Sequence, residues 1–172
     1  DVGDVNDRPT VDLDTATTRA LVRTWTEGDP PVWLTRKPRV VDTDDTTLQR
    51  VTASILPFLD EGDLLEARVT VAPISITWDD AAGVLTLEGP APASAFDDAL
   101  ATLTYTHGPG HALPHERVVE VVAWDAEGPG APASLTLEAI AVNLPPEVRL
   151  SALGEPPPVP WTEGGGPVRL VP

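Results

Sequence analysis

Acidic residues form the groups in this sequence that are best suited to chemistry. Three groups consist of closely spaced carboxylates and the fourth is a single glutamate in a turn: Asp4 with Asp7, Asp42 with Asp44 and Asp45, Asp125 with Glu127, and Glu27. Alternating carboxylates in a loop point to the same side, so they converge without needing a helix. Calcium is a hard cation that takes six to eight oxygen ligands at about 2.3–2.6 Å. The spacing therefore indicates calcium binding, with the four groups expected at one end of the fold.

Three histidines could suggest a metal site, but a polar loop explains them better. His107, His111 and His115 lie four residues apart, which on a helix would place them on one face as a metal site. Pro114 and the stretch Gly108–Gly110 exclude that helix. We therefore expect a polar loop here.

Paired acids do not predict a glycosidase. Asp79–Asp80 falls in a predicted turn and Asp97–Asp98 in the first turns of a predicted helix, where carboxylates have ordinary structural roles. The sequence contains no Ser–His–Asp order, Gly-rich phosphate loop or aspartic-protease signature. We therefore expect a protein that is not an enzyme.

The composition narrows the classes of partner. The chain has 172 residues, a net charge of −16 and a pI near 4.3, which argues against nucleic acid because a phosphate backbone needs clustered Lys and Arg. No apolar run reaches the roughly 18–20 residues of a membrane span. Without cysteine, disulfides and thiol chemistry are excluded. Twenty prolines and 13 glycines beside a hydrophobic fraction of 41% are typical of many short strands separated by rigid turns.

An internal repeat organises the chain. Trp25–Leu34 (WTEGDPPVWL) returns as Trp161–Leu170 (WTEGGGPVRL) with seven identities in ten. Five upstream residues also recur, at an offset of 137: Val5, Asn6, Pro9, Val11 and Leu13 return as Val142, Asn143, Pro146, Val148 and Leu150. A fixed period of this kind is typical of tandem repeats.

The repeat predicts three segments. Residues 1–7 are the tail and linker of a preceding repeat, 8–143 one complete repeat, and 144–172 the opening strands of the next. Because the chain begins with Asp1 and not Met, we expect it to belong to a longer protein. Two or three strands are at best marginally stable alone, so we expect residues 148–170 to be frayed or exchanged between copies.

Alternating apolar residues predict seven to nine strands. The clearest are 48–56, 67–72 and a hairpin over 74–87, whose turn Gly83 closes with a positive φ. Even spacing without a strand–helix–strand rhythm predicts an all-β, Greek-key β-sandwich, followed by the first strands of another repeat.

One short helix is predicted near 93–101. Ser94 is a candidate N-cap, and Asp97 and Asp98 are expected in the first turns. Phe96 and Leu100 share its apolar face.

The five tryptophans divide into three groups. Trp78 and Trp124 belong to predicted strands and are expected in the core. Trp25 and Trp161 begin the repeated turn and are expected where repeats abut. Trp33 lies beside Arg36 and Lys37 and is expected to be exposed, where an aromatic ring stacks on a sugar or on a neighbouring chain.

Five segments, in order, resemble the cadherin repeat: DVNDRP (4–9) the linker pattern, TEGDPPV (26–32) the glutamate turn, VDTDD (41–45) the DxD loop, WDDAAGVLT (78–86) the hairpin, and AWDAEGPGAP (123–132) the late loop. Residues 83–105 look more like the cadherin-like and immunoglobulin-like repeats of giant microbial and protist surface proteins, in which a short helix replaces part of a strand. Two features depart from the cadherin pattern. The LDRE element is absent, and the second linker (141–146) carries no carboxylate.

The resemblance implies a ligand set for calcium at the N-terminal junction. It comprises Asp4, Asp7, Asp42, Asp44 and Asp125, with Asn6 offering a backbone carbonyl. At the C-terminal junction only Glu27 remains, so we expect no calcium there and stiffening by Pro145–Pro146 instead.

These observations predict a non-enzymatic structural repeat of a large extracellular adhesin or surface filament. Its partners would be neighbouring repeats, identical chains in an assembly, and glycans or other surface proteins, with no nucleic acid and no membrane span in this segment. Calcium would be its cofactor and the cell surface or an appendage its location. The alternative is a carbohydrate-binding module of a secreted or surface protein, which requires two or three exposed aromatics in a row.

Overall fold

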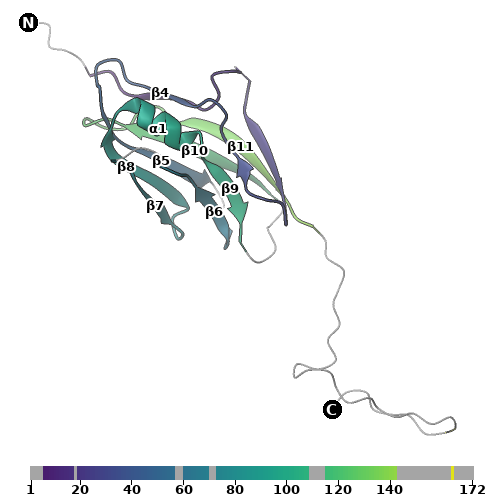
Figure 1. Cartoon of the computed structure of the whole chain (residues 1–172). Coiled ribbons are helices and arrows are strands. Elements are labelled where there is room, and N and C mark those ends of the chain that lie inside the picture. Colours follow the sequence, from purple (N-terminus) through teal and green to yellow (C-terminus); the bar gives the residue numbers. More distant parts are fainter. Residues whose placement is uncertain are drawn as a thin grey trace, which may run out of the picture. The chain divides into compact units, whose positions relative to one another are not determined.

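The computed structural model describes residues 6–17, 19–56, 60–69, 73–108, 115–142 and 164. The chain divides into two units, Asp1–Val142 and Asn143–Pro172. Figure 1 shows the strands and the helix of the first unit. In chain order the elements are β1 (Thr10–Asp12), β2 (Val22–Thr26), β3 (Val32–Trp33), β4 (Arg39–Val41), β5 (Leu48–Leu56), β6 (Asp63–Glu66), β7 (Ser75–Asp79), β8 (Val84–Ala91), α1 (Ala93–Leu100), β9 (Thr104–His107), β10 (Glu116–Trp124) and β11 (Ala133–Ile140).

The strands form a sandwich-like body. The larger sheet has the order β2-β11-β10-β5-β8-β7, the smaller has the order β3-β9-β6, and β1 pairs with β4. Paired strands run antiparallel, except that β2 runs parallel to β11. The prediction of a mostly-β, sandwich-like fold with one short helix is confirmed at this level.

Alternate residues of the strands fill one shared core. The two longest strands show the period of two most clearly, with buried Val51, Ala53 and Ile55 in β5 and buried Val119, Val121 and Ala123 in β10. The smaller sheet contributes Leu65 and Tyr105, and α1 contributes Phe96. Each large apolar side chain buried in this way contributes about 1.5–3 kcal/mol.

Trp25 belongs to this core. Its side chain is 3% exposed, and its ring meets Tyr105 edge to face with centroids 5.7 Å apart. The expectation that Trp25 lies where repeats abut is therefore wrong, because its position on β2 turns the ring toward the smaller sheet. Trp78 and Trp124 are half-buried rather than fully enclosed, and Trp33 is 56% exposed, as predicted.

The helix α1 begins and ends where the sequence predicts, but its start is built differently. Its N-cap is Pro92 and no side chain makes a capping hydrogen bond, so Ser94 does not cap it. Asp97 lies beyond the first turn, and its Oδ1 accepts a hydrogen bond from the Val40 amide of β4 at 2.6 Å. The carboxylate thus joins α1 to β4.

One strand was predicted in the wrong place. The pairing strand is β6 at Asp63–Glu66, and the described part of the predicted strand 67–72, residues 67–69, follows it without strand pairing. The segment pairs earlier because Asp63, which looks like a loop residue in the sequence, is held in the core by polar partners.

The described ends of the first unit, at Asn6 and Val142, lie at opposite ends of β11. Asn6 donates its side-chain amide to Asp125, just beyond β10, while Glu27 accepts a hydrogen bond from the Val142 amide, just beyond β11. The length of β11, about 23 Å at 3.3 Å per residue, separates these contacts. Glu27 therefore does not join the other acidic groups, contrary to the expectation from the spacing. It lies at the C-terminal end, where the resemblance places it, because β2 pairs in parallel with β11.

No helix within the described residues is long and apolar enough to cross a membrane. Apart from Gly164, the residues predicted to open the next repeat lie outside the described residues. The assignment of 1–7, 8–143 and 144–172 to successive repeats remains a prediction.

Candidate metal centre

Three carboxylates converge at the N-terminal end of the first unit. Asp42 and Asp45 come from the loop after β4, and Asp125 directly follows β10. One carboxylate oxygen from each lies within 4.8 Å of the other two. We call Asp42, Asp45 and Asp125 the acidic triad.

Backbone amides orient two members of the acidic triad, Asp42 and Asp125. Asp42 Oδ1 accepts hydrogen bonds from the amides of Asp44 (3.2 Å) and Asp45 (3.0 Å), which turns the loop back on itself. Asp125 Oδ1 accepts from the amides of Glu127 (2.8 Å) and Gly128 (2.6 Å). In each case one oxygen is used in a turn and the other is left for a different partner.

The second oxygens differ in their partners. Asp125 Oδ2 accepts a 3.0 Å hydrogen bond from the Asn6 side-chain amide. Asp42 Oδ2 is buried and has no hydrogen-bond partner among the described residues. A buried carboxylate oxygen without a partner is costly, and no described Lys or Arg forms an ion pair with any of the three acids.

The carboxyl pKa values of Asp42 and Asp125 differ in the same direction as their hydrogen bonding. Burial raises the pKa of Asp42 above its usual value, and the neighbouring Asp44 carboxyl adds to that increase. Burial also acts to raise the pKa of Asp125, but hydrogen bonds from Asn6, Gly128 and Glu127, together with the Arg8 charge, bring it below its usual value. Of these two carboxylates, Asp42 is therefore the one whose charge is less well compensated.

The other predicted ligands lie around the triad. The Asp44 carboxylate is exposed and accepts from the backbone amide of Asp7 at 3.1 Å, which lowers its pKa. Asn6 reaches the triad through its side chain, while a role for its backbone carbonyl remains a prediction. Asp4 lies outside the described residues.

Asp45 was missed as a ligand because the every-second-residue pattern favours Asp42 and Asp44. The available signal was the run of acids in Asp42–Asp45, where an aspartate turn brings the fourth residue back beside the first. Oxygen ligands of this number and charge suit a hard divalent cation such as calcium.

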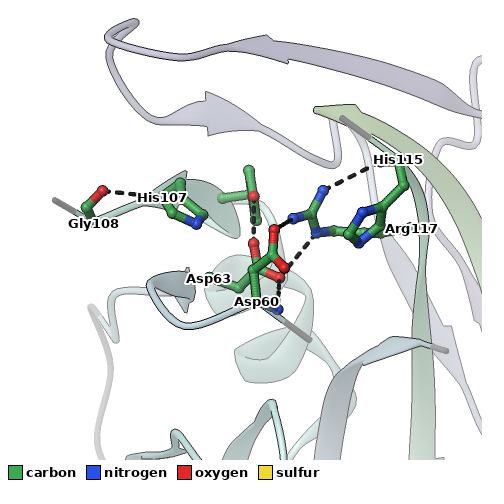
Figure 2. Close-up of polar contacts among 7 residues, drawn as sticks. Asp60, Asp63, His107, Gly108, His115 and Arg117 are labelled. Carbon is green, nitrogen blue, oxygen red and sulfur yellow. Dashed lines mark hydrogen bonds and ion pairs between the residues drawn. The ribbon is translucent and has the colours of Figure 1, made fainter. Parts of the chain in front are cut away.

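A second polar cluster lies between the two sheets (Figure 2). Arg117 of β10 is fully buried, and its Nε and Nη2 donate to Asp63 (2.9 Å) and Asp60 (2.5 Å). Asp63 also accepts from the Tyr105 hydroxyl at 2.6 Å. We call these four residues the Arg117 network.

His107 lies beside the Arg117 network and is 8% exposed, so the expectation of a polar loop is wrong at this residue. His107 is the last residue of β9 and pairs with Asp63 of β6, which carries its ring into the core. Its Nδ1 lies 3.0 Å from the Gly108 carbonyl oxygen, while Nε2 has no partner among the described residues. His111 lies outside those residues, and the His115 carbonyl accepts from Arg117.

Asp60, Asp63 and His107 also place ligand atoms within 4.8 Å of one another. However, the guanidinium of Arg117 is already bound to both carboxylates, so a metal would have to compete with a buried positive charge. Burial and the hydrogen bond to Asp63 raise the pKa of Tyr105, so its hydroxyl remains a donor at neutral pH. The Arg117 network is therefore better suited to joining the sheets than to holding an ion.

One member of each acid pair, Asp79 and Asp97, has a structural role. Asp79 Oδ1 accepts from the amides of Ala81 and Ala82 in the β7–β8 turn, which Gly83 closes with φ +64°. Asp97 joins α1 to β4, as described above.

Comparisons of the chain with protein-family models, with curated proteins and with solved structures find no match in any of the three.

Proposed function

We propose that this chain is a non-enzymatic structural repeat of a large extracellular adhesin or surface filament, stiffened by calcium at its N-terminal junction. The repeat is a Greek-key sandwich of the cadherin-like or immunoglobulin-like kind. It acts by extension and by end-to-end or lateral assembly with neighbouring repeats and identical chains. The net charge of −16 keeps molecules apart unless cations bridge them.

The acidic triad is the observation that carries this proposal. It lies where the incoming segment meets the sandwich, since Asn6 contacts Asp125 and the Asp7 amide contacts Asp44. Arg8 donates to the Pro129 carbonyl at 2.8 Å in the same region. An ion held by the triad would therefore fix both loops next to the segment that leads in.

The internal repeat supports a tandem arrangement. Four buried residues of the first segment, Pro9, Leu13, Trp25 and Leu34, recur unchanged in the second as Pro146, Leu150, Trp161 and Leu170. Exposed Trp33 instead becomes Arg169. Recurrence of these buried, largely apolar residues is expected if both segments form the same strands in successive repeats.

The turn glycines agree with that interpretation. Gly28 has φ +89° and its counterpart Gly164 has φ +82°, a conformation that favours glycine.

Calcium titration of the full chain tests the proposal. After treatment with a chelator, added calcium should raise the Tm, and calorimetry should give a Kd of about 0.1–1 mM, the range of extracellular modules. At 10 to 100 times Kd the expected stabilisation is about 1.4–2.7 kcal/mol. Asp125→Asn should weaken binding by at least about tenfold because it removes one of three ligand charges.

Asp98→Asn is the matched control, because Asp98 is an exposed acid of α1 outside the triad. It removes the same charge and should leave calcium binding unchanged. Equal shifts with calcium and magnesium in wild type and both variants would mean that general screening, not a built site, stabilises the protein.

The carbohydrate-binding alternative in its usual form needs a row of exposed aromatics. Within the described residues, Trp25 is buried and Trp33 is the exposed tryptophan, so a single ring and not a row is available.

A further inference from the structure

The outer face of the smaller sheet contains a groove beside Trp33. The groove has a volume of about 280 Å³ and runs between Trp33 and Pro31 on one side and Glu66 and Arg68 on the other. Thr102 and Thr104 also line it. We call it the Trp33 groove.

The strand register explains why these side chains share a face. Trp33 of β3 lies opposite Thr104 of β9, which in turn lies opposite Glu66 of β6. The neighbouring row contains Tyr105 and Leu65, both fully buried. Because side chains alternate along a strand, the row from Trp33 to Glu66 faces outward.

The threonine hydroxyls beside the groove contact the backbone. The Thr102 hydroxyl donates to the Ala99 carbonyl at 2.7 Å and accepts from the Arg68 amide at 2.7 Å. The Thr104 hydroxyl donates to the Glu66 carbonyl at 3.5 Å. With its hydroxyl occupied by these two short bonds, Thr102 leaves mainly its methyl group for a ligand.

The three larger side chains remain free for a ligand. Trp33 is 56% exposed, and Glu66 and Arg68 are also exposed. Within the described part of the chain, the indole NH, the Glu66 carboxylate and the Arg68 guanidinium take part in no hydrogen bond or ion pair. The groove therefore offers an aromatic face, an anionic acceptor and a cationic donor together.

We propose that the Trp33 groove binds one hexopyranose ring of a glycan. The C–H face of such a ring stacks on indole, and adjacent hydroxyls both donate to a carboxylate and accept from a guanidinium. The opposite charges of Glu66 and Arg68 leave the groove nearly neutral, which suits an uncharged ligand on a protein of charge −16.

The size of the groove limits the ligand to a single ring. Its volume lies just below the range of ligand pockets, which span about 300–1,000 Å³. With about a dozen heavy atoms in contact, binding should be weak, with a Kd in the millimolar range. This inference is independent of the acidic triad, so its failure would leave the calcium proposal intact.

NMR titration of the full chain provides the test. Trp33→Phe identifies the Trp33 indole NH signal among those of the five tryptophans. Methyl glycosides of glucose, galactose and mannose are then added separately to about 50 mM, well above the expected Kd. At least one should shift the Trp33 signal saturably, together with the backbone amide signals of the groove residues Arg68 and Thr104. Followed by these amide signals, the affinity should fall at least tenfold in Trp33→Ala and by less in Glu66→Gln or Arg68→Met.

Leu56→Ala is the control for loss of an exposed apolar side chain, since Leu56 lies on β5 and is 40% exposed. It should bind as wild type does. The proposal is overturned if no glycoside gives a saturable shift, or if the groove's backbone amide signals shift with unchanged affinity in Trp33→Ala. A shift caused by a short polyproline peptide and by none of the sugars would assign the groove to peptides instead.

Discussion

The two carboxylate oxygens of Asp42 have different roles. Its Oδ1 supports the loop through two amide hydrogen bonds, while Oδ2 is buried without a described partner. Burial raises the pKa of its carboxyl, so the folded protein disfavours the charged form. Asp42 therefore lowers the stability of the ion-free protein as the pH rises through the carboxyl range.

Asp42→Asn should consequently have opposite effects with and without calcium. Asparagine keeps the Oδ1 acceptor and removes the charge, so at pH 7 in chelator the variant should have a higher Tm than wild type. The difference should vanish at a pH below both the folded and the unfolded pKa, where wild-type Asp42 is also neutral. With calcium, the variant should bind at least about tenfold more weakly, measured by calorimetry. A lower Tm of Asp42→Asn than of wild type in chelator would show that the charged carboxylate stabilises the loop even without a bound ion.

Secondary-structure elements show which parts of the fold the sequence predicts well. The helix and the β7–β8 hairpin were predicted from local signals, since apolar spacing in 93–100 and Gly83 act within a few residues. β6 was misplaced because Asp63 belongs to a strand only through its contacts with Tyr105 and Arg117, which are far away in sequence.

The candidate site also has residues that local motifs predict and residues whose positions depend on the fold. Asp42 and Asp125 each stand in a short recognisable motif, and the sandwich brings them together. Asp45 could be predicted as a ligand only if the turn of its loop were known. The position of Glu27 depends on the parallel direction of β2 beside β11. Sequence spacing contains no signal for strand direction at a sheet edge.

Two substitutions in α1 separate packing from capping. Phe96 is fully buried, so Phe96→Ala should lower the free energy of unfolding by about 3–5 kcal/mol. Ser94→Ala should change it by less than about 0.5 kcal/mol, because Ser94 makes no capping bond. Urea unfolding followed by circular dichroism measures both. A loss of about 1 kcal/mol in Ser94→Ala would restore the capping role that the sequence suggests.

At the scale of the whole molecule, the Arg117 network joins the two sheets. Arg117 belongs to β10 of the larger sheet, whereas Asp63 and Tyr105 belong to β6 and β9 of the smaller one. Every charge in this contact is buried or nearly so. The network therefore fixes how one layer lies on the other.

Replacing Arg117 should weaken the contact between the two sheets. Arg117→Met leaves two carboxylates without their cation, and we expect a loss of about 3–5 kcal/mol in the free energy of unfolding, measured in urea. Arg19→Met is the control, because Arg19 is exposed, and should change stability by less than about 0.5 kcal/mol. Similar small changes in both variants would mean that apolar packing alone sets the position of the sheets.

The parallel pairing of β2 with β11 determines how the first unit would carry a pulling force. Traction applied through the N-terminal segment and through Val142 draws these neighbouring strands past each other lengthwise. The paired residues from Val22–Thr136 to Thr26–Ile140 would then resist together in shear, whereas an antiparallel hairpin pulled at its open end unzips one rung at a time. The tensile strength of the unit would thus depend on β2, an edge strand of the larger sheet.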